Sequence, residues 1–324
     1  MTVLEAIQRS TEFLTKKGVE SPRLQAGLLL AHLLKQPRMR LYLEFERVLT
    51  PVEVDGFREL IRRRGQREPL QHIVGSTSFC GLEIAVNRDV LIPRPETELL
   101  AERGWTFLNQ LSTLRSSVHP PQFCYGGRAT EDGSTINHQP STAMDFGTGS
   151  GCLAIALAFK CPAAEVYAVD ISPEALALAR LNAARHGLAE RIRFLQGDGF
   201  AAAPEGARFD LIISNPPYIP SGEIASLQPE VRDYDPHGAL DGGADGLDYG
   251  RRLAAECGPF LKPEGRMMLE FGDGQAEGLR EILQQQMWIV EAIEADYTHR
   301  PRIMVARRSN STAEEPSAAG TQPG

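Results

Sequence analysis

Segments that alternate between strand and helix patterns run from Ala143 to Ala306 and constrain the fold more than any other feature of the chain. Helical patterns occupy residues 151–160, 173–186, 248–261 and 275–286. Between and beyond them lie seven segments typical of strands: Ala143–Phe146, Val166–Asp170, Ile192–Gln196, Phe209–Ser214, Arg266–Glu270, Trp288–Ala295 and Arg302–Ala306. This alternation predicts an α/β protein with a mainly parallel sheet covered by helices on both faces. Ligands of such sheets bind beyond the carboxyl ends of the strands.

Residues 1–70 predict a separate bundle of three helices that recruits the substrate. The second helix begins with Ser21 as its N-cap, and the third begins with a capping box of Thr50 and Glu53. The run Arg62–Arg64 closes the third helix. Cations complement the dipole at a helix C-terminus, so this run favours a solvated helix end over a binding role.

The remaining sequence divides by changes in pattern. Residues 71–98 alternate apolar and polar and then become proline-rich and charged, which predicts a hairpin linker between two domains. The α/β domain then covers 99–308 and begins with a helix, Leu99–Leu108. Residues 109–142 lose all periodicity and predict a flexible insertion, and 309–324 predict a disordered tail.

Composition narrows the function classes. The chain has 42% hydrophobic and 23% charged residues, as expected of a globular domain. No apolar run is long enough to span a bilayer and the N-terminus lacks a signal pattern, so we expect a cytoplasmic protein. Five scattered cysteines without a Cys-x-x-Cys pair indicate neither disulfides nor a metal site. A net charge of −8 argues against binding DNA or RNA through phosphates.

A glycine-rich loop follows the first predicted strand and opens the next helix. The loop reads Asp-Phe-Gly-Thr-Gly-Ser-Gly from Asp145 to Gly151, and its glycines allow close approach of the backbone to a ligand. The second strand ends in Asp170, where βαβ units place a carboxylate that binds ribose hydroxyls. The loop lacks a phosphate-binding Gly-Lys-Ser/Thr sequence, so a nucleoside without phosphates fits it best.

The third predicted strand is followed by Gly197-Asp198-Gly199-Phe200. Asp198 is placed to accept a hydrogen bond from an adenine amino group, and Phe200 is placed to lie against the adenine ring. An ordinary turn followed by a buried phenylalanine explains the same residues equally well.

The fourth predicted strand runs into Asn215-Pro216-Pro217-Tyr218. The prolines have no N–H and a fixed φ, so the turn is stiff and rich in hydrogen-bond acceptors. The Asn215 oxygen and the neighbouring carbonyls suit a small planar NH₂ group, with the Tyr218 ring covering it. Alone, this turn would favour an ordinary proline-rich loop. The glycine loop upstream makes a functional site the better interpretation.

Together these motifs resemble the S-adenosylmethionine-dependent methyltransferases that modify a planar NH₂ nitrogen. The likeness extends to the peptide chain release factor glutamine methyltransferases and runs from about residue 10 to Arg308. Besides the Asp-x-Gly-x-Gly-x-Gly loop, it is carried by Ser21–Leu43, Pro69–Gly75 and Val90-Leu-Ile-Pro-Arg-Pro-Glu-Thr-Glu98. It implies a Rossmann-like, seven-stranded class I methyltransferase sheet with a small N-terminal helical bundle.

The resemblance also implies a function and a set of site residues. Members of the family methylate the side-chain amide nitrogen of the glutamine in the Gly-Gly-Gln motif of release factors, which supports translation termination. Asn215 and Pro216 would be catalytic, and Asn215 to Tyr218 would bind the glutamine. S-adenosyl-L-methionine would be bound by Gly147, Thr148, Gly149, Ser150, Gly151, Asp170, Asp198, Gly199, Phe200 and Asn215.

Three positions depart from the family pattern. Asp235 replaces an expected Glu, and His299 replaces an expected small residue. Gly199 stands where a bulkier side chain often covers the adenine, and we expect Phe200 to substitute for that side chain.

No His, Cys or Lys lies beside the Asn-Pro-Pro-Tyr turn to act as a base, so catalysis should depend on positioning. Holding an amide nitrogen in line with a methyl donor can supply on the order of 7–11 kcal/mol. The Asn215 oxygen and the Pro216 carbonyl would accept the two amide hydrogens and stabilise the positive charge that develops on the nitrogen.

Other functions remain open on the sequence alone. The substrate could be a ribosomal-protein glutamine, or less favourably an adenine amino group in a flipped base. A non-catalytic scaffold is disfavoured because the loop and Asn215 are intact. We expect release factors as partners, free or on the ribosome, and a monomer that binds neither membranes nor specific nucleic-acid sequences.

Overall fold

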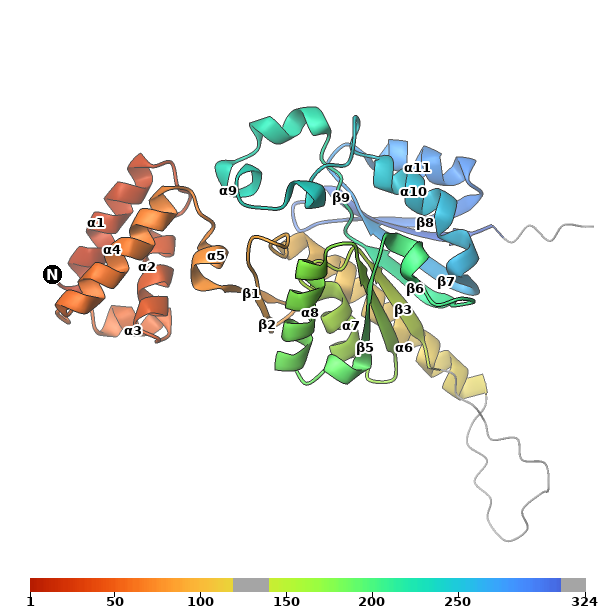
Figure 1. Ribbon diagram of the computed structural model, residues 1–324, viewed down its shortest axis with the longest axis horizontal. Helices are drawn as coiled ribbons and strands as arrows, with labels where there is room; N and C mark the ends of the chain where they lie inside the picture. Colours follow the sequence, from red (N-terminus) through yellow and green to blue (C-terminus); the bar gives the residue numbers. More distant parts are fainter. Residues whose placement is uncertain (119–139, 310–324) are drawn as a thin grey trace, which may run out of the picture.

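A small helical domain packs beside a larger α/β domain in the computed structural model, which describes residues 1–118 and 140–309 (Figure 1). The helices of the small domain are α1 Val3–Lys16, α2 Pro22–Leu33, α3 Arg38–Leu43, α4 Pro51–Gly65 and α5 Leu70–Val74. The sequence predicts α1, α2 and α4 but not α3 and α5, because five or six residues are too few to show a helical period.

The predicted capping box of α4 is confirmed. The Thr50 hydroxyl accepts from the Glu53 backbone N–H at 3.3 Å, and the Glu53 carboxylate accepts from the Thr50 N–H at 2.8 Å. The predicted N-cap at Ser21 is wrong. Ser21 has φ 46° and ψ 49°, and its side chain makes no capping hydrogen bond. Pro22 at the first helical position starts α2 instead, because its fixed φ already suits a helix.

The connection between the domains is more helical than the sequence predicts. The hairpin is short, with β1 Ser76–Phe79 antiparallel to β2 Leu82–Ala85. Helix α6 then runs from Pro95 to Val118, so the prediction of an irregular insertion is wrong for 109–118. The rest of that insertion up to residue 139, and the predicted tail beyond Ser309, lie outside the described residues.

All seven predicted strands of the large domain form one sheet, which confirms the predicted fold class. They are β3 Thr142–Phe146, β4 Glu165–Asp170, β5 Ile192–Gln196, β6 Phe209–Ser214, β7 Leu261–Glu270, β8 Trp288–Ala295 and β9 Pro301–Arg308. The strand order is β5-β4-β3-β6-β7-β9-β8. The first five strands in this order are parallel, and β9 runs antiparallel to both β7 and β8.

Helices cover both faces of this sheet (Figure 1). Beside α6 they are α7 Cys152–Lys160, α8 Pro173–Arg185, α10 Asp248–Glu256 and α11 Ala276–Gln285. The short helix α9 Pro229–Arg232 lies in the segment that connects β6 and α10. Single 3₁₀ turns cover Ala189–Arg191, Gly199–Ala202, Ser221–Ser226, His237–Ala239 and Gly258–Phe260.

Strand periodicity explains why the sheet has two cores. Successive side chains point to opposite faces, so Ala143 and Leu211 join the core beneath α6, α7 and α8. Met144 and Ile212 join the core beneath α10 and α11. No helix within residues 1–118 and 140–309 combines the length and apolar character needed to cross a membrane.

A buried ion pair joins the two domains. Arg64, whose side chain is 4% exposed, donates to the Glu230 carboxylate of α9 at 2.6 Å. Arg67 donates to the same carboxylate through two nitrogens. The prediction of a solvated arginine run therefore fits Arg62, which is exposed and paired with Glu59, but is wrong for Arg64.

Replacing Glu230 with glutamine tests this link. The variant leaves Arg64 charged and buried with fewer acceptors. We expect the free energy of unfolding in urea to fall by about 3 kcal/mol, the lower end for breaking a buried ion pair, because Gln25 still accepts from Arg64. Glu59→Gln, which breaks an exposed pair screened by solvent, is the matched control and should cost much less than Glu230→Gln. Equal losses in the two variants would contradict a stabilising role for the buried pair.

Candidate active site

A cavity of about 360 Å³ opens at the carboxyl ends of β3, β4 and β6. Its wall combines the glycine loop after β3, the residues after β4 and β5, the Asn-Pro-Pro turn after β6, and the segment that leads into α6. This is the edge of a parallel sheet where the sequence predicts ligand binding.

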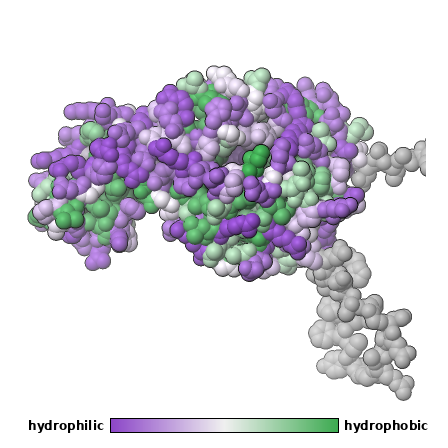
Figure 2. All heavy atoms as spheres, in the orientation of Figure 1, coloured by the Kyte–Doolittle hydropathy of each residue, from purple (hydrophilic) through white to green (hydrophobic). Residues whose placement is uncertain are grey.

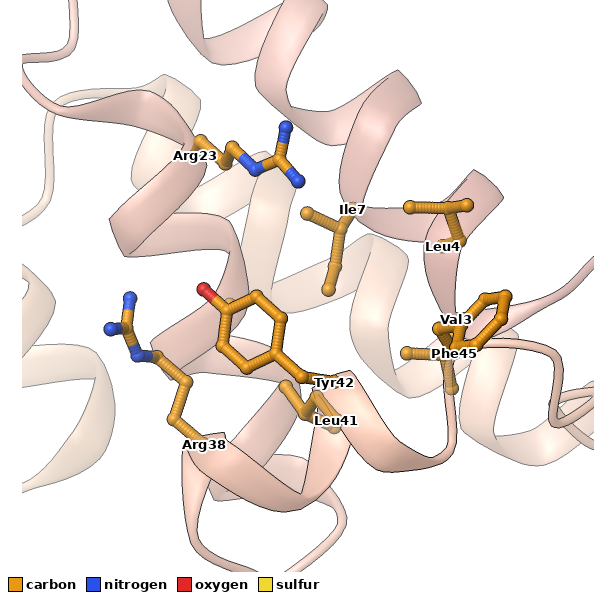
Figure 3. A pocket seen from close by; sticks show the side chains of 9 residues that line it. Val3, Leu4, Ile7, Arg23, Arg38, Leu41, Tyr42 and Phe45 are labelled. Atoms are coloured by element: carbon orange, nitrogen blue, oxygen red, sulfur yellow. The ribbon is translucent and has the colours of Figure 1, made fainter.

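A smaller pocket lies within the helical domain, between α1, α2 and α3 (Figure 3). Its volume is about 40 Å³, and Ile7, Leu41, Tyr42 and Phe45 form much of its wall. Figure 2 shows hydrophobic residues gathered on part of this domain's surface, and Leu43 is 84% exposed. A space this small holds about one or two waters and not a nucleoside, so the larger cavity is the candidate site.

The glycine loop presents bare backbone to the cavity. Gly147 and Gly149 have φ of 75° and 53°, a conformation that favours glycine. A Cβ built on either residue meets no atom within 4 Å. Gly151 does not line the cavity. Its φ is 83° and a Cβ there would lie 2.9 Å from the Cβ of Ala179, so this glycine lets α7 pack closely against α8.

Two backbone N–H groups hold the Asp170 carboxylate beside the glycine loop. The Gly149 N–H donates to Asp170 Oδ2 at 2.7 Å, and the Ser172 N–H donates to Oδ1 at 3.0 Å. Each oxygen keeps a lone pair, and Asp170 lines the cavity. Two hydroxyl groups of a bound ribose can therefore reach a carboxylate whose orientation is already fixed.

Asp145 is a buried anchor to which the sequence analysis assigned no role. Its Oδ2 accepts from the Thr148 hydroxyl at 2.6 Å and from the Ala154 N–H at 3.1 Å, which ties the loop to the start of α7. Burial raises the pKa of Asp145 to about 7. The sequence could have indicated this role, because Asp145 is the first residue of the glycine motif.

The turn after β5 differs from the prediction. Asp198 lines the cavity, and its carboxylate pairs with Arg252 at 2.5 Å. Phe200 does not line it: it is 5% exposed, and its ring stacks on Phe260 with the centroids 4.7 Å apart. The turn of 3₁₀ helix at 199–202 directs this ring into the core, so the expected substitution for an adenine cover is wrong.

Gly199 is required by packing. A Cβ there would lie 2.5 Å from the Phe146 ring, so the bulkier residue expected at this position would have to displace that ring. Ile171, directly after Asp170, lines the cavity and is 67% exposed. An exposed large apolar side chain at this point suits the face of a planar ring, and the sequence analysis missed it because it reads as the end of a strand.

The Asn-Pro-Pro-Tyr turn is only partly on the cavity wall. Asn215, Pro216 and Pro217 line it, whereas Tyr218 does not. The Tyr218 backbone carbonyl accepts from Gln275 Nε2 at 2.8 Å, and the Tyr218 hydroxyl lies 3.5 Å from Glu270. Tyr218 therefore supports the turn from behind.

The two polar atoms of the Asn215 amide differ in their hydrogen bonding. Its Nδ2 donates to the Thr97 hydroxyl at 3.0 Å. Its Oδ1 is buried and has no partner among the residues that the structure describes. A buried oxygen without a donor is costly, so a site with an orphaned acceptor favours a ligand that supplies an N–H. Across 1–118 and 140–309, no group of three or more His, Cys, Asp or Glu is placed to hold a metal.

Comparison with known proteins identifies the family. A family model described as PrmC N-terminal domain matches residues 5–75, and one described as Methyltransferase small domain matches 134–227. The release factor glutamine methyltransferase of Geobacter sulfurreducens is 41% identical over 85% of this chain and 86% of its own length. That of Chlorobaculum tepidum is 39% identical over 93% of this chain and 95% of its own length.

The chain belongs to the release factor glutamine methyltransferase family. A solved methyltransferase from Pyrococcus furiosus is more distant, at 18% identity and a TM-score of 0.45 over 71% of this chain and 90% of its own.

Asp235, where the resemblance to this glutamine methyltransferase family predicts Glu, forms an ion pair beside the cavity. Arg94 donates to Asp235 Oδ2 at 2.7 Å, so the pair holds the Pro93–Glu98 segment beside the cavity. Burial raises the pKa of Asp235 to about 6, and its Oδ1 has no partner in the described part of the chain. Nothing in the structure explains His299.

Two glycine substitutions separate packing from backbone strain. Gly199 and Gly206 both have positive φ, at 63° and 71°, but only Gly199 has atoms within 4 Å of a Cβ. We expect Gly199→Ala to lower the free energy of unfolding by about 1–3 kcal/mol more than Gly206→Ala, because its methyl group must displace the Phe146 ring. Chemical denaturation of the two variants measures this difference. Equal losses would mean that the Phe146 ring yields freely.

Proposed function

We propose that this protein transfers a methyl group from S-adenosyl-L-methionine to the side-chain amide nitrogen of the glutamine in the Gly-Gly-Gln motif of peptide chain release factors. Membership of the family supports this proposal, because the relatives are release factor glutamine methyltransferases. The structural observation that carries it is the buried Oδ1 of Asn215, which has no hydrogen-bond partner within residues 1–118 and 140–309; the residue itself lines the cavity beside the glycine loop.

The residues present fit the cofactor. Gly147 and Gly149 leave room where side chains would stand, and Asp170 offers one lone pair on each oxygen to the ribose hydroxyls. Ile171 can lie against the adenine, and Asp198 can accept from the adenine amino group while it remains paired with Arg252. When bound, the cofactor supplies a methyl group on a positively charged sulfur.

The turn residues orient the substrate nitrogen. Asn215 Oδ1 accepts one amide hydrogen of the glutamine, and the Pro216 carbonyl accepts the other. Both acceptors face positive charge as it develops on the nitrogen, so they stabilise the transition state more than the bound substrate. No ionisable side chain of the turn has to remove a proton, and the proton can leave to water.

A transfer assay tests the proposed function. The protein is incubated with methyl-labelled S-adenosylmethionine and, separately, with a release factor, ribosomal proteins and DNA. We expect label in the release factor alone and none in a release factor whose Gly-Gly-Gln glutamine is replaced by alanine. Label in a ribosomal protein or in DNA would replace this proposal with one of the two alternatives. We further propose a cytoplasmic location, which fits the buried free thiols of Cys152, Cys161 and Cys257.

Removing the side chain of Asn215 should slow the chemical step. We expect Asn215→Ala to lower kcat by roughly 10²–10³, as for loss of one oxyanion-hole donor, while cofactor affinity changes little. Steady-state kinetics at saturating release factor, with calorimetric titration of the cofactor, measure both. A raised KM with unchanged kcat would mean that Asn215 contributes only uniform binding.

Asp170→Ala should act on the cofactor instead. We expect binding of S-adenosylmethionine to weaken by about 1.5–3 kcal/mol for each lost ribose hydrogen bond, because these bonds are charge-assisted. Calorimetric titration measures this. Glu174→Ala, which removes an exposed carboxylate at the start of α8, is the control and should leave affinity unchanged. Unchanged affinity in Asp170→Ala would remove Asp170 from the cofactor site.

A further inference from the structure

Three elements bring buried polar groups together behind the Asn215 amide. Thr97 lies in the first turn of α6 and is 2% exposed, and Glu270 ends β7 and is 3% exposed. The Thr97 hydroxyl lies 3.0 Å from Asn215 Nδ2 and 2.7 Å from Glu270 Oε2. Thr97 also lines the cavity, whereas Glu270 lies behind it.

The Glu270 carboxylate fixes which group donates and which accepts in the two hydrogen bonds that connect Asn215, Thr97 and Glu270. An ionised carboxylate can only accept, so the Thr97 hydroxyl donates its single proton to Glu270. The Thr97 oxygen can then only accept from Asn215. The end of the Asn215 amide that faces Thr97 must therefore be the NH₂ group, and the oxygen must face away from it. A flipped amide would place two oxygens 3.0 Å apart with no proton between them.

We propose that Thr97 and Glu270 are positioning residues that hold the Asn215 amide with its oxygen toward the substrate nitrogen. The inference rests on the proposed function, because it assigns Oδ1 of Asn215 to a substrate N–H. It adds two residues, 118 and 55 positions from Asn215 along the chain, that act on the substrate only through Asn215.

The surroundings of Glu270 make the direction of the Thr97 and Asn215 hydrogen bonds sensitive to pH. Glu96 at the start of α6 and Arg302 on β9 are the charged groups near it, and the Tyr218 hydroxyl lies 3.5 Å from Oε1. Burial raises the pKa of Glu270 to about 7. A protonated Glu270 can donate to Thr97, which frees the Thr97 proton to face Asn215 and permits the flipped amide. The fixed direction is therefore half lost at about pH 7, is nearly complete from about one pH unit above it, and disappears as the pH falls further.

Two variants of Thr97 and one control variant test the proposal in the full-length protein. Thr97→Val keeps the side-chain shape but removes the hydroxyl, and we expect kcat to fall on the order of 10–100-fold with cofactor affinity nearly unchanged. Thr97→Ser restores the hydroxyl and should recover activity to within about threefold of wild type. Ser214→Ala is the control. It removes another buried hydroxyl, which donates to the Phe146 carbonyl and not to Asn215, and it should leave kcat within about threefold of wild type. Equal loss in the Val and Ser variants, or wild-type kcat in Thr97→Val, would overturn the proposal.

Glu270→Gln adds a pH test. A glutamine can present either an oxygen or an NH₂ group to Thr97, so the direction of the chain is no longer fixed. We expect wild-type kcat to fall as the pH drops from 8 to 6, and kcat of the variant to be lower and to depend less on pH. Asp145 and Asp235 also titrate near the cavity but are present in both proteins. If kcat of the wild type and of Glu270→Gln depended on pH in the same way, the proposal that ionised Glu270 fixes the Asn215 amide would be contradicted.

A double-mutant cycle and a ligand-free measurement complete the design. Because Thr97 acts only through Asn215, Thr97→Val should have almost no further effect on kcat in the Asn215→Ala background, and full additivity would overturn the proposal. In the ligand-free protein, NMR should show slow hydrogen exchange of the Asn215 side-chain NH₂, becoming at least about tenfold faster in Thr97→Val. Unchanged exchange would overturn the positioning role, whereas failure of the wild type to methylate release factors would overturn only the proposed function.

Discussion

The site depends on three parallel strands, β4, β3 and β6, that end side by side. Asp145 of β3 lies opposite Ala168 of β4 and Ile213 of β6, so the loops that follow these strands emerge at one edge of the sheet. This register brings the glycine loop, Asp170 and Asn215 to one cavity although they are far apart in sequence. A shift of one residue between strands would turn the side chains at their ends to the opposite face.

Much of this arrangement could be predicted because its signals are local. Strands buried on both faces, such as β6, are continuous apolar runs, and the chemistry-bearing motifs directly follow them. The family resemblance rested on the glycine loop and on three segments before the sheet, Ser21–Leu43, Pro69–Gly75 and Val90–Glu98. The parts that failed lack a local signal: polar composition hid the helix over residues 109–118 at the end of α6, and nothing in Gly199-Phe200 shows that a 3₁₀ turn will direct the ring into the core.

Long-range polar contacts could not be predicted from one sequence. Arg64 and Arg62 sit in the same arginine run, yet one is buried against Glu230 and the other is exposed beside Glu59. Thr97 lies in a segment that the sequence predicts only as the proline-rich, charged end of a linker. Its function in the structure comes from contacts with Asn215 and Glu270, which are set by how α6 packs on the sheet. Composition and periodicity carry no information about such contacts.

Three buried acids beside the cavity, Asp145, Asp235 and Glu270, share one structural role. Each accepts hydrogen bonds from a segment that must be held in place: the glycine loop, the Arg94 side chain and the Thr97 hydroxyl. Burial is the largest cause of the raised pKa of each, to about 7, 6 and 7. Since these acids ionise near pH 4 in the unfolded chain, their own contribution to the free energy of unfolding decreases as the pH rises from about 4 to 7, because the unfolded state releases protons that the folded state retains.

An amide in place of each acid would avoid this loss of stability, but an amide can donate as well as accept. Only an ionised carboxylate fixes the direction of every hydrogen bond made to it. Ionising Glu270 near neutral pH therefore costs stability, and the same ionised form determines which end of the Asn215 amide faces the cavity. This opposition between stability and a defined polar geometry is expected where buried polar groups are kept for function rather than for folding.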